Sequence, residues 1–303
     1  MAETTGKTLP TPLIDRAFTP SGASPVRDFL RRLWHIRLAG VGIVIVGIVI
    51  VAALFAPLIA PYDPTQKNTR NLLKGPTTQH PLGTDELGRD TLSRVIYGAR
   101  ISLEVGIIAV GISLVIGVLL GLVAGYVGGA TDSIIMRIMD GLLAFPAIVL
   151  ALAITAMLGP SLNNVMIAIG ITGIPGFARL VRGQVLTTKG LEYVQAAQAV
   201  GAGDGRLMLR HILPNIVAPI IVQTSLSIAA AILAEAALSF LGLGIQPPAA
   251  SWGAMLNTAK GYLSRTTWLA IAPGTAIFIT VLGFNFLGDA IRDVLDPRLR
   301  SSS

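Results

Sequence analysis

One ionisable residue lies inside a long apolar stretch, and it is the first candidate for chemistry. Glu235 is the only charged residue between positions 216 and 242. A carboxyl group at membrane depth is costly and marks a functional position by default. Two roles are open for Glu235. It faces a pathway through the membrane, where it would meet an amino group or another polar helix, or it has a structural role, as a hydrogen bond between helices or as a snorkelling residue near the outer end of the helix.

A second candidate is the polar segment 191–215, which has the pattern of a helical hairpin. A short helix to Val200 is expected first, then a glycine-rich bend over 201–205 and a second short helix from Arg206. Pro214 marks the entry into the next apolar stretch. A short exposed hairpin of this kind has the shape of a docking element for another protein, and an ordinary connecting loop is the alternative.

No residues have the spacing of a catalytic, cofactor or metal site. The sequence has no Cys, and its three His residues, His35, His80 and His211, lie in separate segments. There is no GxxxxGK[ST] motif, and no strand is expected before the glycines at 201–205. An enzyme is therefore the weaker hypothesis, and no cofactor or metal is expected.

The composition places the chain in a membrane. Only 13% of its 303 residues are charged and 52% are hydrophobic, whereas a soluble domain carries about 25% charged residues. The net charge of +7 comes without a basic run that alternates with aromatic residues, so it does not indicate nucleic-acid binding. The bilayer is the expected partner.

Six uncharged or nearly uncharged stretches predict six transmembrane helices in an all-α protein. Residues 141–178 carry no charge and would form a single helix of about 57 Å, far longer than the bilayer core. The turn cluster at 159–164 divides them. The expected spans are 39–61, 101–125, 134–158, 163–182, 216–242 and 266–288.

These spans define the expected domain organisation. A tail, 1–38, precedes a transmembrane domain, 39–290, and a second tail, 291–303, follows it. The cytoplasmic side normally carries the excess of Lys and Arg. With both tails, the 183–215 loop, Arg137, Arg179 and Arg182 inside, 15 of the 23 Lys and Arg residues are cytoplasmic. The loops 61–100 and 243–266 are then external.

Small residues and prolines predict how the spans pack and bend. In the second span, small residues recur every four positions, which places them on one helix face where another helix can approach closely. Prolines inside four of the spans indicate kinks in a bundle that moves. The small residues are Ala109, Ser113, Gly117, Gly121 and Gly125, and the prolines are Pro146, Pro175, Pro219 and Pro273.

The 191–215 segment also resembles a known family. Ala196-Ala197, then Gly201, then Leu213-Pro214 resemble the EAA loop of ABC importer permeases, which in that family docks into a separate ATPase subunit. Gln195 departs from the Glu of the motif, and His211 departs from its usual Ile. The resemblance implies an ATPase-coupling role for Glu192, Gln195, Ala196, Ala197, Gly201, Asp204, Arg206, His211, Leu213 and Pro214.

Three further motifs resemble the peptide and nickel branch of that family, and in particular its C-type permease of dipeptide, oligopeptide or glutathione importers. They are His80-Pro81-Leu82-Gly83-Thr84-Asp85 with the residues to Arg94, Leu241 to Pro248 with Ser251-Trp252-Gly253, and Gly288-Asp289 through Asp296-Pro297. The four motifs occur in the family's order and cover roughly residues 25–300.

The resemblance implies a type I ABC importer permease fold in a bacterial inner membrane. It also implies a second homologous permease, two ATP-binding subunits and an extracytoplasmic substrate-binding protein as partners, with ATP hydrolysis outside this chain. The solute is expected to be a peptide, with nickel or another small solute as the alternative. A stand-alone secondary transporter and a scaffold without transport remain as different classes.

Overall fold

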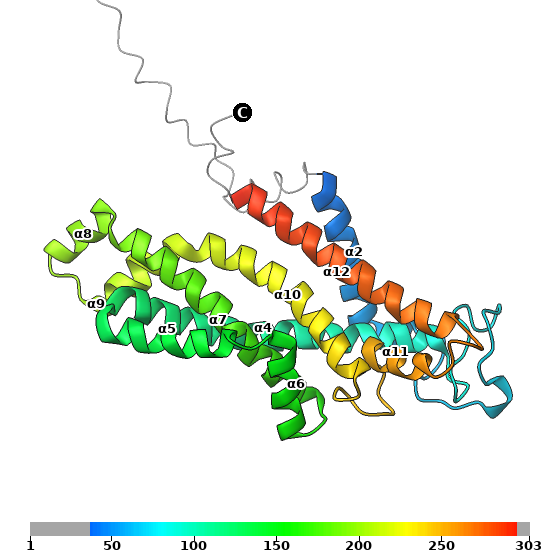
Figure 1. Ribbon diagram of the computed structural model, residues 1–303. Coiled ribbons are helices and arrows are strands. Elements are labelled where there is room, and N and C mark those ends of the chain that lie inside the picture. Colours follow the sequence, from blue (N-terminus) through cyan, green and yellow to red (C-terminus); the bar gives the residue numbers. More distant parts are fainter. Residues whose placement is uncertain (1–36, 296–303) are drawn as a thin grey trace, which may run out of the picture.

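The structure is a computed structural model that describes residues 37–295. Over that range all regular secondary structure is helical, apart from one isolated bridge between Thr84 and Asp90 (Figure 1). The predicted tail 1–38 lies outside the described residues except for its last two positions. Of the tail 291–303, only residues 291–295 are described.

Four helices are long and apolar enough to cross a membrane. They are α4 (Thr91–Val127), α7 (Leu162–Lys189), the helical stretch Asp204–Phe240 that ends in α10 (Val217–Phe240), and α12 (Trp268–Leu295). A bent pair, α5 (Gly129–Leu143) and α6 (Ala147–Leu158), makes a fifth if it counts as one span. By this measure the described part has four or five spans. The predicted six requires α2 (Arg37–Leu54), which is shorter and leads into the single turn α3 (Ala56–Ile59).

Helix α4 begins ten residues earlier than the predicted start at residue 101. Asp90 caps its first turn, because the Asp90 Oδ2 atom accepts the backbone N–H of Ser93 at 2.8 Å. The polar segment before it therefore ends at residue 90. We call residues 61–90 the cap; it contains one short 3₁₀ turn, η1 (Thr69–Asn71).

The span predicted over 134–158, with a kink at Pro146, is divided into two helices. The structure has α5 and α6 there, bent by 88° to each other. The break falls at Phe145 and Pro146. Proline has no backbone N–H to continue the helical hydrogen bonds and disfavours helical geometry at the preceding residue. Pro175 and Pro273, in contrast, lie inside α7 and α12 as predicted.

The close packing predicted for the second span is confirmed. Gly117, Gly121 and Gly125 are buried along one face of α4 that contacts α7. A Cβ atom at Gly121 would lie 2.4 Å from the carbonyl oxygen of Ala178, and one at Gly117 would lie 2.5 Å from the Phe177 Cβ. Side chains at these positions would push the two helices apart.

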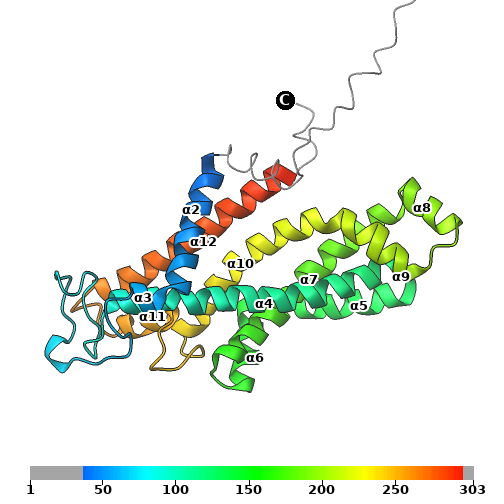
Figure 2. The same cartoon turned by 180° about the vertical axis from the view of Figure 1, so that it is seen from behind.

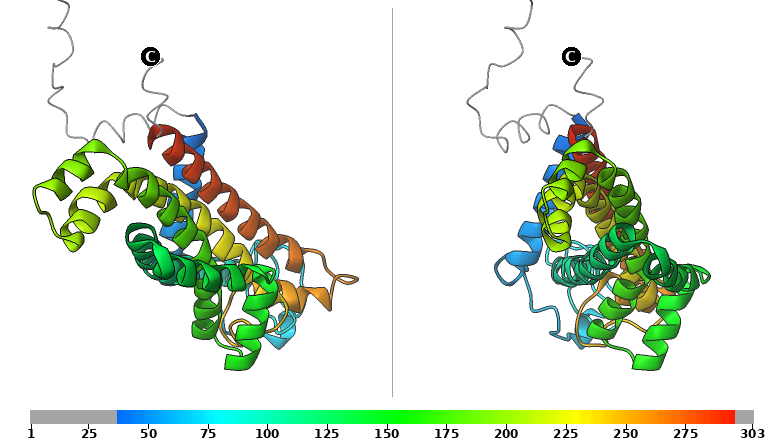
Figure 3. Two further views of the ribbon diagram at one scale, coloured as in Figure 1. Left: turned by 60° about the vertical axis from the view of Figure 1, so that its left-hand side comes forward. Right: turned by 90° about the vertical axis from the view of Figure 1, so that its left-hand side faces the viewer.

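The two ends of the molecule differ in what they carry. The segment after α7 extends beyond the core at one end, while the cap and α11 (Trp252–Lys260) lie at the other (Figures 1 and 3). Helix α2 packs along α12, and Ala39 near the start of α2 contacts Ala290 and Val294 near the end of α12 (Figure 2). The described chain thus begins and ends at the same end of the bundle.

Candidate functional site

The segment between α7 and α10 forms a hairpin, as predicted. We call residues 190–216 the hairpin. It consists of α8 (Glu192–Ala199), the short helix α9 (Asp204–Arg206), a π-helical stretch η2 (Leu207–Ile212) and a 3₁₀ turn η3 (Leu213–Ile216). Gly201 has φ +86°, a conformation that is strained for residues with a side chain. The predicted bend at this glycine is confirmed.

The base of the hairpin is fixed to the core by apolar packing. Val194, Leu207 and Ile212 are buried in one cluster with Leu122 of α4 and Val185 of α7. These buried side chains of the hairpin thus pack on α4 and α7, the two helices that pack most closely in the core. A displacement of the hairpin would therefore act directly on α4 and α7.

Two polar contacts add to this packing. The Tyr126 hydroxyl at the end of α4 donates to the Asp204 Oδ1 atom at 2.7 Å, and the Lys189 Nζ atom donates to the Tyr126 carbonyl oxygen at 2.6 Å. Tyr126 and Asp204 are 78 positions apart. No spacing in the sequence indicated this pair.

Most of the residues assigned to coupling lie on the outer surface of the hairpin. The structure brings them together on this one element. Exposed are Glu192, Gln195, Ala196, Gly201, Asp204, Arg206 and Pro214, and partly buried are Ala197, His211 and Leu213.

The tip of the hairpin also exposes apolar side chains. Val200 is 86% exposed, and Leu191, Tyr193 and Leu209 are exposed as well. Exposed apolar patches are typical of surfaces that contact another protein or a membrane. Sequence reasoning missed Val200 as part of this surface, because one valine at a helix end carries no pattern.

Glu235 lies away from the hairpin and is completely buried. Its Oε1 atom accepts the Ser239 hydroxyl at 2.6 Å, and its Oε2 atom has no hydrogen-bond partner among the described residues. Gly253 of α11 packs beside it, because a Cβ there would lie 2.3 Å from the Ala236 carbonyl oxygen. Glu235 therefore lies where α10 meets α11.

A cavity of about 200 Å³ opens between α4, α7 and α10, near the middle of each helix. Its lining has no charged residue and does not include Glu235. Hydroxyl groups and small side chains form much of its wall, among them Ser113, Thr172, Gly173, Ser227 and Ala230. The sequence did not indicate it, since its residues come from separate helices.

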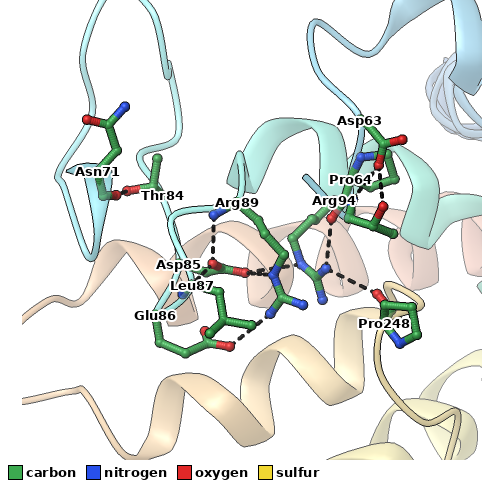
Figure 4. A network of polar contacts seen from close by, with 11 residues as sticks. Asp63, Pro64, Asn71, Thr84, Asp85, Glu86, Leu87, Arg89, Arg94 and Pro248 are labelled. Carbon is green, nitrogen blue, oxygen red and sulfur yellow. Dashed lines mark hydrogen bonds and ion pairs between the residues drawn. The ribbon is translucent and has the colours of Figure 1, made fainter. Parts of the chain in front are cut away.

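The cap is held by a network of charged side chains (Figure 4). Asp85 accepts the Arg89 backbone N–H at 2.9 Å through Oδ1 and the Arg89 Nε–H at 2.6 Å through Oδ2. Arg94, in the first turn of α4, donates to the carbonyl oxygens of Pro64 at 3.0 Å and Pro248 at 3.4 Å. The network joins the cap, α4 and the loop before α11.

A second buried pair, His80 and Asp90, also stabilises the cap. The His80 Nδ1 atom lies 2.8 Å from Asp90 Oδ1, and the Ser93 hydroxyl donates to Asp90 Oδ2 at 2.7 Å. Asp90 thus stabilises the N-terminus of α4 through Ser93 and, at the same time, binds His80 of the cap segment. The motif from His80 to Arg94, which the sequence analysis used only as a resemblance, is the structural core of this region.

Two carboxyl groups of the cap have shifted acidities. Burial raises the pKa of Glu86, and the neighbouring Asp85 raises it further. The hydroxyl and the backbone N–H of Thr65 lower the pKa of Asp63. Glu86 therefore titrates closer to neutral pH than an exposed glutamate.

Fold and site together define a helical, multi-pass membrane protein that presents an exposed helical hairpin at one end. The model of the binding-protein-dependent transport system inner membrane component matches residues 117–301, and that of the N-terminal TM domain of oligopeptide transport permease C matches residues 24–76. The chain belongs to the family of inner membrane components of binding-protein-dependent transport systems. The resemblance drawn from the motifs is confirmed.

Relatives with assigned names are similar over almost the whole chain. The dipeptide transport system permease protein DppC of Alkalihalophilus pseudofirmus is 47% identical over 93% of this chain and 92% of its own. The di/tripeptide transport system permease protein DppC of Pseudomonas aeruginosa is 46% identical over 92% of this chain and 94% of its own. The glutathione transport system permease protein GsiD of Pectobacterium atrosepticum is 47% identical over 92% of this chain and 93% of its own.

Solved structures support the fold. The methionine ABC transporter MetNI in inward-facing conformations aligns with a TM-score of 0.56 at 16% identity, covering 67% of this chain and 96% of that one. An amino acid ABC transporter solved with histidines gives 0.53, also at 16% identity, over 66% of this chain and 94% of the other. The chain has the helical fold of ABC importer permeases.

Proposed function

We propose that this chain is the transmembrane permease subunit of an ATP-driven importer that carries peptides into the cell. One observation carries the proposal: relatives 46% and 47% identical over more than nine-tenths of the chain are named dipeptide, di/tripeptide and glutathione permeases. Nickel and other small solutes are the alternative.

The test is uptake by the reconstituted transporter. The chain is co-expressed with a homologous permease, two ATP-binding subunits and a substrate-binding protein, and the complex is placed in vesicles. ATP-dependent accumulation of a labelled dipeptide or of glutathione is expected. Accumulation of Ni²⁺ without either peptide, or uptake of peptide without ATP, would contradict the proposal.

The partners follow from the same proposal. A second, homologous permease completes the pathway, two ATP-binding subunits supply the energy, and an extracytoplasmic protein delivers the solute. The hairpin is the contact with an ATP-binding subunit. Its exposed apolar tip at Val200 and its packing on α4 and α7 support that role, because a push on the hairpin would reach the core helices.

Gly201 allows a direct test of the hairpin. A Cβ atom at Gly201 meets nothing within 4 Å, so a substitution there acts through the positive φ and not through a collision. Gly201→Val is expected to lower uptake and peptide-stimulated ATP hydrolysis together. Gly203→Ala is the matched control, since Gly203 also faces open space but has φ −67°. Intact coupling in Gly201→Val would remove the role assigned to the bend.

Six membrane crossings, with both tails cytoplasmic, complete the topology. The contact of Ala39 with Ala290 and Val294 supports an even number of crossings. Counting α2 and the bent α5–α6 pair with the four long helices gives six. A fluorescent protein fused after residue 303 is expected to be bright and alkaline phosphatase to be inactive there; an active phosphatase would reverse the orientation.

The cavity between α4, α7 and α10 is this chain's share of the translocation pathway. Its uncharged lining is mostly small and apolar, with three hydroxyl groups, and therefore has no charge that would select solutes by the charge of their side chains. Since the natural chain has no cysteine, Ala230→Cys introduces a single thiol into this wall. A charged thiol reagent is expected to label it and to block uptake. Leu233→Cys, which is outside the cavity on the same helix, is the control; equal labelling of both would contradict the assignment.

Glu235 affects transport indirectly under this proposal. Its buried carboxyl group accepts the Ser239 hydroxyl one turn farther along α10, beside the contact with α11. Glu235→Gln is expected to change the maximal rate of uptake equally for all peptides. A change confined to peptides of one charge would restore a direct pathway role.

A further inference from the structure

The search for unassigned sites leads to a second, larger cavity at the hairpin end of the bundle. It has a volume of about 580 Å³ and lies between α7, α10 and the last turn of α12. Its size falls within the range of small-molecule sites. It shares no lining residue with the central cavity, and none of the residues assigned to coupling lines it.

The lining of this cavity contains both apolar and polar side chains. Leu180, Val222 and Leu226 are among the apolar ones. Arg292 is the only charged residue in the lining. Among the described residues no carboxylate neutralises it, because Asp289 and Asp293 on the same helix are outside the lining and form no ion pair with Arg292.

Two of the polar groups are free to bind a ligand. Arg292 and Gln184 make no side-chain hydrogen bond or ion pair with any described residue, whereas Gln223 donates to the Ser227 hydroxyl at 3.3 Å. A guanidinium group binds a phosphate or carboxylate through two parallel hydrogen bonds. Arg292 and Gln184, without partners among the described residues and next to apolar side chains, would therefore fit an anion that has a long apolar body.

The position of the cavity selects among such anions. Arg292 and Leu295 lie in the last turn of α12, and Gln184 lies five residues before the end of α7, so the polar part is at the edge of the membrane. Leu226 lies farther along α10, toward the membrane interior. A basic pocket of this kind between transmembrane helices suits an anionic lipid head group.

We propose that this cavity binds an anionic phospholipid, with its phosphate on Arg292 and Gln184 and an acyl chain along Leu180, Val222 and Leu226. The site goes beyond the transport function proposed above and does not depend on which solute is carried. It would make the stability of the permease depend on the charge of the surrounding lipid.

Lipid binding to the purified complex in detergent tests the proposal without any uptake measurement. Phosphatidylglycerol is added, and bound lipid is counted by native mass spectrometry while the unfolding temperature is followed. Wild type is expected to retain phosphatidylglycerol in preference to phosphatidylcholine. Arg292→Gln is expected to weaken this binding about tenfold, the loss of one charge-assisted contact, and Arg292→Lys is expected to keep part of it.

Controls separate the lipid from other anions and from general charge effects. Arg210→Gln removes an exposed arginine of the hairpin that does not line the cavity, and it is expected to leave lipid binding unchanged. Inorganic phosphate and a dipeptide are expected not to compete with the lipid. Competition by either, or equal lipid binding by wild type and Arg292→Gln, would overturn the assignment.

Discussion

The cap and the hairpin lie at opposite ends of the same helices and are stabilised by opposite means. In the cap, Asp85, Arg89 and Arg94 are buried and bonded to one another. In the hairpin, Val194, Leu207 and Ile212 are packed against the core, and the charged side chains face outward.

This difference separates a rigid end from a responsive one. A buried ion pair tolerates little displacement, because moving one partner leaves an unpaired charge in the interior. An apolar contact between α8 and the core can slide at lower cost, since it has no direction. The cap is therefore suited to hold the ends of α4 and α11 in place, and the hairpin is suited to transmit a push.

The largest effect is expected from breaking the cap network. Asp85→Ala leaves Arg89 and Arg94 without their shared carboxylate and is expected to cost about 3–5 kcal/mol in the free energy of unfolding. Chemical denaturation in detergent measures it. Glu86→Ala is the control, because Glu86 contacts the rim of the network and its Oε2 atom has no partner. If both variants lost the same stability, the buried network would not be what holds the cap.

A smaller loss in the free energy of unfolding is expected from a change in the hairpin. Tyr126→Phe removes the hydrogen bond to Asp204, worth about 1 kcal/mol, while the aromatic packing stays. The same denaturation experiment detects it. Tyr193→Phe is the matched control, since its 3.3 Å bond to the His211 carbonyl oxygen is exposed, and it is expected to change nothing measurable. A loss at Tyr126 as large as that at Asp85 would erase the contrast between the two ends.

The smallest effect is a dependence on pH confined to the cap. Because the folded pKa of Glu86 is raised above its ordinary value of 4.5, its contribution to stability is fully present below that value. It is lost as pH rises through the folded pKa. Glu86→Gln is expected to remove this part of the pH dependence above pH 4.5. An unchanged profile would mean that the carboxyl group is not desolvated.

The sequence predicted the parts of the fold that depend on local pattern. The four-residue spacing of glycines in α4 indicated the contact with α7, and Gly201 indicated the bend. Pro146 indicated a kink, but not its size of 88°, because a proline inside an apolar stretch is compatible with a slightly kinked or a fully broken helix. Neighbouring helices decide among these.

The contacts that hold the site together were harder to predict from the sequence. Asp85 and Arg94 were recognised as parts of a motif, but the carbonyl oxygen of Pro248 comes from a loop 154 positions away. The Tyr126–Asp204 bond and the cavity walls likewise depend on how separate helices meet. Residue spacing carries no information about such contacts.

The central claim is that the hairpin binds a separate ATP-hydrolysing subunit, and the accessibility of Val200 tests it most directly. Val200→Cys gives a single thiol at a position that is 86% exposed in this chain. Its labelling by a maleimide is compared with and without the ATPase subunits, with Leu263→Cys, near the cap end, as the control. Protection of residue 200 alone on assembly is the predicted result. Equal labelling of residue 200 in the free permease and in the assembled complex would contradict the account.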